Sequence, residues 1–330
     1  MHYYELESFY KKHFNIIFDN EFRKIKEAGE NLLAEKLADL VHFIAQKHPK
    51  FETQSDQVYK SIGGEFATAY RFWQSGKNIF QLTEGITQLL SNTEVGAITL
   101  DMVNLPFETI YLAFPGTMCP KGMDGENLLG LYIQLSNKTD KPEAEKYLTL
   151  KFMHAYKHLK EQGQIDQQFT ALLGGEVTFG FNKKSNVFDQ IVEQMQQSDM
   201  PIEKDHFLKI IEIVLNTMMY LSTEKPDTQY IKKQKTQESA NKNKKKNKFK
   251  LDVDHFIIGS KIKIDNKIPK IVYVGDIQSH EALDKSKSWF VRGHWRQQPY
   301  GPGMSLRKTI WIEPYIKGDG ELIKKAYTIH

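Results

Sequence analysis

The stretch from 232 to 250 limits most strongly how this chain can fold. It reads KKQKTQESANKNKKKNKFK, and Phe249 is almost its only apolar side chain. Such a segment cannot bury enough surface to order itself. We therefore predict a lysine-rich flexible linker over 232–250, which separates a helical α+β domain at 1–231 from a β-rich, basic and aromatic module at 251–330.

The lysines of this segment allow two interpretations. Lys244, Lys245, Lys246 and Lys248 are dense enough to hold RNA or an acidic surface electrostatically. A solvated linker that keeps the protein soluble explains them equally well. The whole chain carries 45 Lys and Arg against 41 Asp and Glu, a net charge of +4, which is too small to indicate a nucleic-acid-binding protein.

Helical periodicity dominates the first ninety residues. Between Leu6 and Lys47 apolar residues recur at spacings of three and four, which predicts two helices around Gly29. The pattern continues from Gln57 to Leu90, with a second, short helix from Thr83. Further helices are predicted at 187–197 and after Asp205, which can act as an N-cap.

Strand-like runs follow the first helices. The sequences AITLDMV (97–103) and TIYLAF (109–114) flank Asn104-Leu105-Pro106 and predict two strands joined by a turn, with 128–135 as a third strand beside them. Residues 253–264 and 271–274 are also predicted strands. The expected fold is α+β, with a helical N-terminal part packed on a small antiparallel sheet and a β-rich C-terminal module.

Residues 288–318 hold three of the four tryptophans, with arginines and lysines between them. The runs at 289–291 and 309–312 are rich in β-branched and aromatic residues, and prolines and glycines lie between them, which predicts a two-stranded ribbon with a long loop. Because side chains alternate along a strand, one face should carry Arg292, His294 and Arg296 and the other Val291, Gly293 and Trp295.

This ribbon is the candidate partner-binding site. Its cationic face suits a carboxylate, a phosphate or a peptide backbone, and tryptophans can stack on a base or an aromatic side chain. The predicted contact residues are Arg292, Gly293, His294, Trp295, Arg296, Tyr300 and Trp311. In the alternative interpretation Trp295 and Trp311 belong to the core, and Arg292 and His294 form a polar pair at a sheet edge.

Several kinds of chemistry are missing from the sequence. It has no phosphate-binding glycine loop, no HExxH, no G-x-S-x-G, and a single cysteine, Cys119, so neither a cofactor nor a metal site is expected. A non-enzymatic role is favoured. A metal-independent ribonuclease with His294 and Arg292 at its centre stays open, because it needs only an acid, a base and a cation.

The location expected from the sequence is the cytoplasm. The lone cysteine fits a reducing compartment, and neither a secretion signal nor a run of eighteen apolar residues is present. We therefore expect no contact with a membrane.

Four islands of sequence resemble a family of type V-A anti-CRISPR proteins from phages and mobile elements. The first is Arg292-Gly293-His294-Trp295, followed by Trp311, Pro314 and Gly318. The other three, in the same order as in the family, are Ile79-Phe80-Gln81-Leu82, Leu105-Pro106 with Tyr111, and Pro226-Asp227 with Tyr230. The overlap begins near residue 57, whereas the lysine-rich segment and residues 297–306 depart from the family's pattern.

The resemblance implies a protein of the bacterial host cytoplasm that lowers production of the type V-A CRISPR effector nuclease. It would recognise that nuclease as a nascent polypeptide on the ribosome and provoke loss of its mRNA. Arg292, His294, Trp295 and Trp311 would contact the partner, the ribosome or mRNA, and the central helices and sheet would hold the peptide. A general single-stranded nucleic-acid binder remains an alternative.

Overall fold

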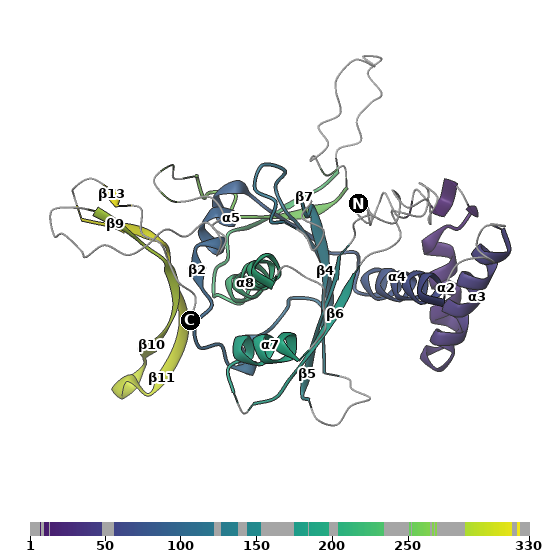
Figure 1. Cartoon of the computed structure of the whole chain (residues 1–330), viewed down its shortest axis with the longest axis horizontal. Coiled ribbons are helices and arrows are strands. Elements are labelled where there is room, and N and C mark those ends of the chain that lie inside the picture. The colour runs from purple at the N-terminus through teal and green to yellow at the C-terminus, as the bar shows by residue number, and fades with distance from the viewer. Residues whose placement is uncertain are drawn as a thin grey trace, which may run out of the picture.

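The computed structural model of the chain (Figure 1) describes residues 7, 10–12, 14–47, 56–121, 127–137, 144–152, 175–183, 185–197, 204–233, 251, 253–264, 266, 268, 288–318 and 322–323. Of residues 56–61, 322 and 323 it describes the backbone only. Residues 271–274, and Lys244, Lys245, Lys246 and Lys248 with most of the lysine-rich segment, lie outside these ranges. The strand and the linker expected there stay predictions.

Seven strands form the main sheet, in the order β6-β5-β4-β3-β1-β8-β7. They are β1 (Ile79–Leu82), β3 (Thr109–Ala113), β4 (Gly130–Ser136), β5 (Lys146–Phe152), β6 (Glu176–Phe181), β7 (Thr228–Ile231) and β8 (His255–Ile258). Neighbouring strands are antiparallel from β3 to β6 and between β7 and β8, whereas β1 runs parallel to β3 and β8. The pairing predicted between 109–114 and 128–135 is confirmed, within a larger and mixed sheet.

The strand predicted at 97–103 is wrong. This segment is irregular and contains a single 3-10 turn, η3 (Leu100–Met102). Its apolar residues Ile98, Leu100 and Val103 are buried in the same core as the inner face of the sheet. Residues 97–103 therefore form a connecting segment that is apolar because it is buried, and its apolar run resembles that of a strand.

Three N-terminal helices lie on one side of the sheet: α2 (Phe18–Ala28), α3 (Leu33–Lys47) and α4 (Asp56–Gln74). Helix α4 reaches the strands, where Phe72 meets Tyr132 edge to face, and α2 and α3 pack on α4 (Figure 1). Because side chains alternate along a strand, Ile79, Tyr111 and Tyr132 point toward these helices. Phe80 and Leu112 point to the opposite face. The predicted break at Gly29 is confirmed, because Gly29 ends α2 with φ of 94°.

The opposite face carries α5 (Glu84–Ser91), α7 (Val187–Gln196) and α8 (Lys204–Leu221). The helices predicted from Thr83 and at 187–197 are confirmed, and Thr83 caps α5 by accepting a hydrogen bond from the Ile86 N–H. Since α8 begins at Lys204, Asp205 lies in its first turn and not at the N-cap. From Lys209 to Tyr220 every residue of α8 is buried, which requires cover on more than one side.

A second β layer provides that cover (Figure 1). Its strands β10 (Gly293–Tyr300) and β11 (Leu306–Ile312) pair with each other, and β10 also pairs with β2 (Thr93–Glu94). A third small sheet contains β12 (Tyr315–Lys317), β9 (Ser288–Val291) and β13 (Leu322–Ile323). The α+β class is confirmed, with α8 between the main sheet and the β10–β11 pair.

The predicted two-stranded ribbon is present in a different register. Residues 289–291 belong to β9 and pair with β12, whereas 306–312 pairs with 293–300. The loop is also shorter than predicted, because Gln297 to Tyr300 continue β10 and only 301–305 connect the strands, through η5 (Pro302–Met304). Pro299 is tolerated because β2 covers only Gly293 and His294 on the other side of β10.

The boundary between the predicted domains stays a prediction. Strand β8, which follows the lysine-rich segment in the chain, lies between β1 and β7 of the main sheet. Residues on both sides of that segment therefore build one sheet.

Candidate functional site

Strands β10 and β11 with their connection, residues 293–312, form the candidate site and are called the ribbon below. Its inner face meets α8 and the segment between α5 and β3. Trp295 lies opposite Trp311 with the ring centroids 6.0 Å apart, and Gln297 lies opposite Thr309, to which its amide donates a hydrogen bond of 2.9 Å. Gln297 also lies 3.3 Å from the sulfur of Met102 but stays exposed, so this face is covered at the tryptophans and opens to solvent at Gln297.

Both inner tryptophans are hydrogen-bonded to residues behind the ribbon. The indole N–H of Trp295 donates to the Asn216 side-chain oxygen on α8 at 2.7 Å, and that of Trp311 donates to the Thr93 hydroxyl at 3.1 Å. Trp311 also meets the Tyr220 ring edge to face. The two rings are half-buried against the main core. This geometry matches the alternative in which the tryptophans serve packing, and a role in partner contact remains a prediction.

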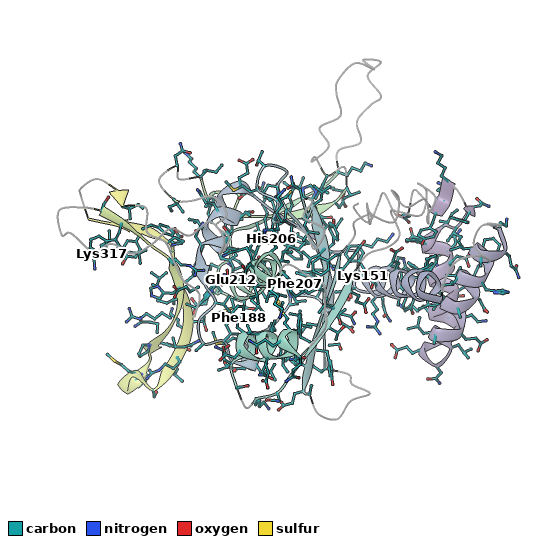
Figure 2. All side chains as sticks on the ribbon, viewed as in Figure 1. Lys151, Phe188, His206, Phe207, Glu212 and Lys317 are labelled. Carbon is teal, nitrogen blue, oxygen red and sulfur yellow. The ribbon has the colours of Figure 1, made fainter. Side chains whose placement is uncertain are left out.

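Arg292 does not share an exposed face with His294 and Arg296, contrary to the alternation predicted. It lies between β9 and β10, where the strand is interrupted, and its side chain is only 13% exposed. Its guanidinium lies 3.7 Å from a carboxylate oxygen of Glu212 and 4.0 Å from Glu94. Figure 2 shows Glu212 on α8, in the interior of the molecule.

A second cation completes this buried ionic cluster. Lys209, one turn before Glu212 on α8, donates to the Glu212 carboxylate at 2.5 Å and to the Ser91 carbonyl at 3.2 Å. Lys209 and Glu212 are both buried. Arg292 and Lys209 thus both face the carboxylate of Glu212 and stabilise its negative charge. These contacts connect the start of the ribbon with α8 and α5.

Gly293 is buried and permits close approach between β10 and its surroundings. A Cβ atom at this position would lie 2.5 Å from the Thr93 hydroxyl and 2.8 Å from the Pro314 ring. Because no side chain fits there, Gly293 holds the ribbon against β2 and presents no side chain to a partner.

The outer face of the ribbon faces solvent. His294, Arg296 and Tyr300 are exposed on β10. Their cross-strand partners on β11 are Ile312 and Ile310, which are half-buried, and Leu306, which is exposed. We call these six residues the outer face. Leu306 is 48% exposed and Tyr300 is 44% exposed. Lys308 adds a cation 5.8 Å from the centre of the Tyr300 ring.

Sequence reasoning identified the polar half of the outer face and missed its aliphatic half. The alternation of Leu306, Ile310 and Ile312 along β11 was visible in the sequence, but the register that places them beside His294 and Arg296 depends on where β10 begins. A surface with cations, an aromatic ring and a row of aliphatic side chains can bind a macromolecule through both charge and apolar contact.

For hydrolytic chemistry the outer face offers His294 and Arg296, with Tyr300 and Lys308 further along the strands. Arg292 is occupied by Glu212, so Arg296 is the exposed cation two residues from His294. Within the described ranges, no group of three His, Cys, Asp or Glu side chains is arranged to hold a metal ion. The same part of the chain contains no helix that combines the length and apolar character needed to cross a membrane.

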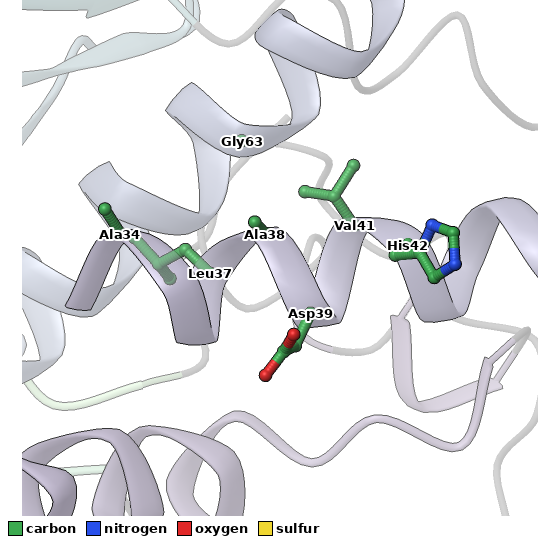
Figure 3. A pocket seen from close by; sticks show the side chains of 7 residues that line it. All are labelled: Ala34, Leu37, Ala38, Asp39, Val41, His42 and Gly63. Carbon is green, nitrogen blue, oxygen red and sulfur yellow. The ribbon is translucent and has the colours of Figure 1, made fainter. Parts of the chain in front are cut away.

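A hollow of about 670 Å³ lies between α3 and α4 (Figure 3). Its lining is mostly small and apolar, and Asp39 and His42 are its polar members: Ala34, Leu37, Ala38, Asp39, Val41, His42 and Gly63. Asp39 forms an exposed ion pair with Lys36 at 3.1 Å. The hollow is far from the ribbon and lies on the N-terminal helices (Figure 1).

Comparison with known proteins gives one family. Residues 80–318, more than half of the chain, match the profile of the AcrVA2-like family, the anti-CRISPR type V subtype A2 family. Among solved structures, the crystal structure of AcrVA2 is similar, with a TM-score of 0.46 and 14% identity over 96% of this chain and 99% of that chain. A comparison with curated proteins finds no match.

Proposed function

Because the chain belongs to the AcrVA2-like family of type V anti-CRISPR proteins, we propose that it lowers production of a type V-A CRISPR effector nuclease. It recognises the nuclease as a nascent polypeptide on the ribosome and causes loss of the mRNA that is being translated. Its partners are the nascent chain and the ribosome or its mRNA, it acts in the cytoplasm of the bacterial host, and it requires neither a cofactor nor catalysis.

The outer face of the ribbon is the observation that supports this function. His294, Arg296 and Tyr300 offer charge and a ring for stacking, and the aliphatic row of β11 offers apolar contact. Asn216 and Thr93 hold the tryptophans of the inner face, and Glu212 holds Arg292 directly before the ribbon, so the outer face is presented rigidly. A rigid surface loses little conformational entropy on binding.

Co-expression with the nuclease tests the proposal. The amounts of nuclease protein and mRNA are measured for an intact reading frame and for the same mRNA without its start codon. We expect loss of the mRNA only when it is translated. The variant with His294→Ala, Arg296→Ala and Tyr300→Ala should lose the effect, and Arg23→Ala with Lys26→Ala, exposed on α2, should keep it. Unchanged mRNA during active translation contradicts the proposal.

A metal-independent ribonuclease is the second candidate, and the exposure of His294 next to Arg296 on one face favours it. Purified protein is incubated with RNA in the presence of EDTA. Cleavage that His294→Ala abolishes supports this candidate, and intact RNA with the wild-type protein removes it.

A further inference from the structure

The two edges of the main sheet differ in how their backbone groups are satisfied. At the β6 edge, the Gln194 amide accepts from the Gly180 N–H (3.1 Å) and donates to the Gly180 carbonyl (2.9 Å). Gln190 does the same at Asn182, with 3.0 and 3.1 Å. No described strand lies beyond β6, and these two side chains of α7 take the place of one, which protects this edge from pairing with another chain.

The β7 edge has no such cover from the residues that the structure describes. Gly259 N–H donates to the Asp227 carbonyl at 2.8 Å, and the antiparallel register alternates from there. The N–H and C=O groups of Gln229 therefore point to β8, while those of Thr228 and Tyr230 point away from the sheet. Thr228, Gln229 and Tyr230 are all exposed.

An aromatic row crosses the sheet and ends at this edge. Phe80 on β1 stacks on Phe256 of β8 at 4.9 Å, and Phe256 meets Tyr230 of β7 at 5.1 Å. Exposure rises along the row, from 3% at Phe80 to 53% at Tyr230. The Tyr230 hydroxyl donates to the Asp254 carboxylate at 2.9 Å, which holds the ring in position for one more neighbour.

We propose that the β7 edge binds an extended segment of the partner polypeptide as an eighth strand. The peptide backbone pairs with Thr228 and Tyr230, and an apolar side chain packs on the Tyr230 ring. Lys232 is exposed two residues after Tyr230. It favours a peptide that carries an acidic residue next to the apolar one. This inference rests on the proposed function in one respect, that the partner is a polypeptide.

Fluorescent synthetic peptides of about 15 residues that tile the nuclease sequence are titrated against the full-length protein. Thr228→Pro removes an outward N–H and leaves the pairing with β8 intact, and Tyr230→Ala removes the end of the aromatic row. Each should weaken binding by about tenfold. Gln229→Ala, an exposed neighbour in the same strand, should change it less than about twofold.

Two further measurements make the test independent of variant folding. Amide hydrogen exchange at Thr228 and Tyr230 should slow when the peptide binds. A peptide carrying a single N-methyl group should lose binding when alternate residues are methylated and keep it at the residues between them, since only every second N–H faces β7.

Several results overturn the inference. Unchanged affinity for Thr228→Pro and Tyr230→Ala, with exchange protection elsewhere, places the peptide at another surface. Slow exchange at these amides in the free protein means that the edge is already occupied, by a second copy if the protection depends on concentration and by the chain itself if it does not. If no peptide binds the wild-type protein, strand addition fails, and the mRNA measurement alone decides the proposed function.

Discussion

At the scale of single residues, Asn216 is the side chain on which the docking of the ribbon most depends. Its amide donates to the Leu90 and Thr93 carbonyls at 3.0 and 2.8 Å and accepts from Trp295, all at a fully buried position. Asn216→Ala removes all three hydrogen bonds and leaves the Thr93 carbonyl and the half-buried Trp295 indole N–H without this partner, so the free energy of unfolding should fall by about 2–4 kcal/mol.

Urea denaturation followed by tryptophan fluorescence measures this loss. Asn20→Ala, at an exposed position of α2, is the matched control and should change the free energy by less than about 0.5 kcal/mol. Equal stability of the two variants would mean that these buried hydrogen bonds do not hold the ribbon.

Substitution by alanine should have opposite effects on stability at Gly293 and at Gly63. A methyl group at Gly293 collides with Thr93 and Pro314, so Gly293→Ala should lower the free energy of unfolding by about 1–3 kcal/mol. At Gly63, inside α4, the nearest atom to a Cβ is 3.9 Å away, and alanine favours a helix. Gly63→Ala should leave stability unchanged or raise it by up to about 1 kcal/mol. A stable Gly293→Ala variant would contradict the tight contact with β2.

Cys119 should react slowly with thiol reagents. Burial raises the pKa of its thiol to about 11, so at pH 8 only about one molecule in a thousand carries the reactive thiolate. Alkylation at pH 8, followed by mass spectrometry, should be far slower than for glutathione and should accelerate when urea unfolds the protein. Modification at the glutathione rate would show that the thiol is accessible and ordinary.

At the scale of elements, α7 protects the sheet through Gln190 and Gln194. Replacing both by alanine removes the side-chain amides that satisfy the Gly180 N–H and C=O and that bond to the Asn182 backbone at this edge. We expect self-association, seen as an increase in mass by light scattering that depends on concentration. Gln196→Ala, exposed on the same helix, should remain like the wild type. A monomeric double variant would show that the edge is protected in another way.

Elements with a local signal were predictable from the sequence. The helices around Gly29, the helix after Thr83 and the apolar helix that became α8 follow from periodicity and capping residues, which act within a few neighbouring positions. The same reasoning failed at Leu100, because burial of an irregular segment produces the apolar run expected of a strand.

Long-range placement was not predictable in this way. The pairing of Phe80 with Phe256 joins segments far apart in the chain, and no local pattern specifies it. The candidate site shows the same limit. The sequence predicted that His294 and Arg296 share one face. The ion pair between Arg292 and Glu212 was not predictable, because it depends on α8 lying behind the ribbon.

At the scale of the whole molecule, the two parts of the chain on either side of the lysine-rich segment depend on each other. The part from 251 to 330 supplies β8 to the main sheet and covers α8 with the ribbon, and the part from 1 to 231 supplies β2 to β10. A fragment of 1–231 alone would expose the edge of β1 that pairs with β8 and the face of α8 that the ribbon covers, which should make it bind apolar dyes and aggregate.

Co-expression of fragments 1–231 and 251–330 tests this dependence. We expect them to copurify as a complex of one copy of each fragment, with the circular dichroism of the intact protein, because the break falls in a segment predicted to be a linker. The control is a pair of fragments cut within α8, between Val214 and Leu215, which should not assemble, since that cut divides a buried helix. If 1–231 is instead a stable monomer with sharp near-ultraviolet circular dichroism, the main sheet does not need β8, and the two parts are independent folding units.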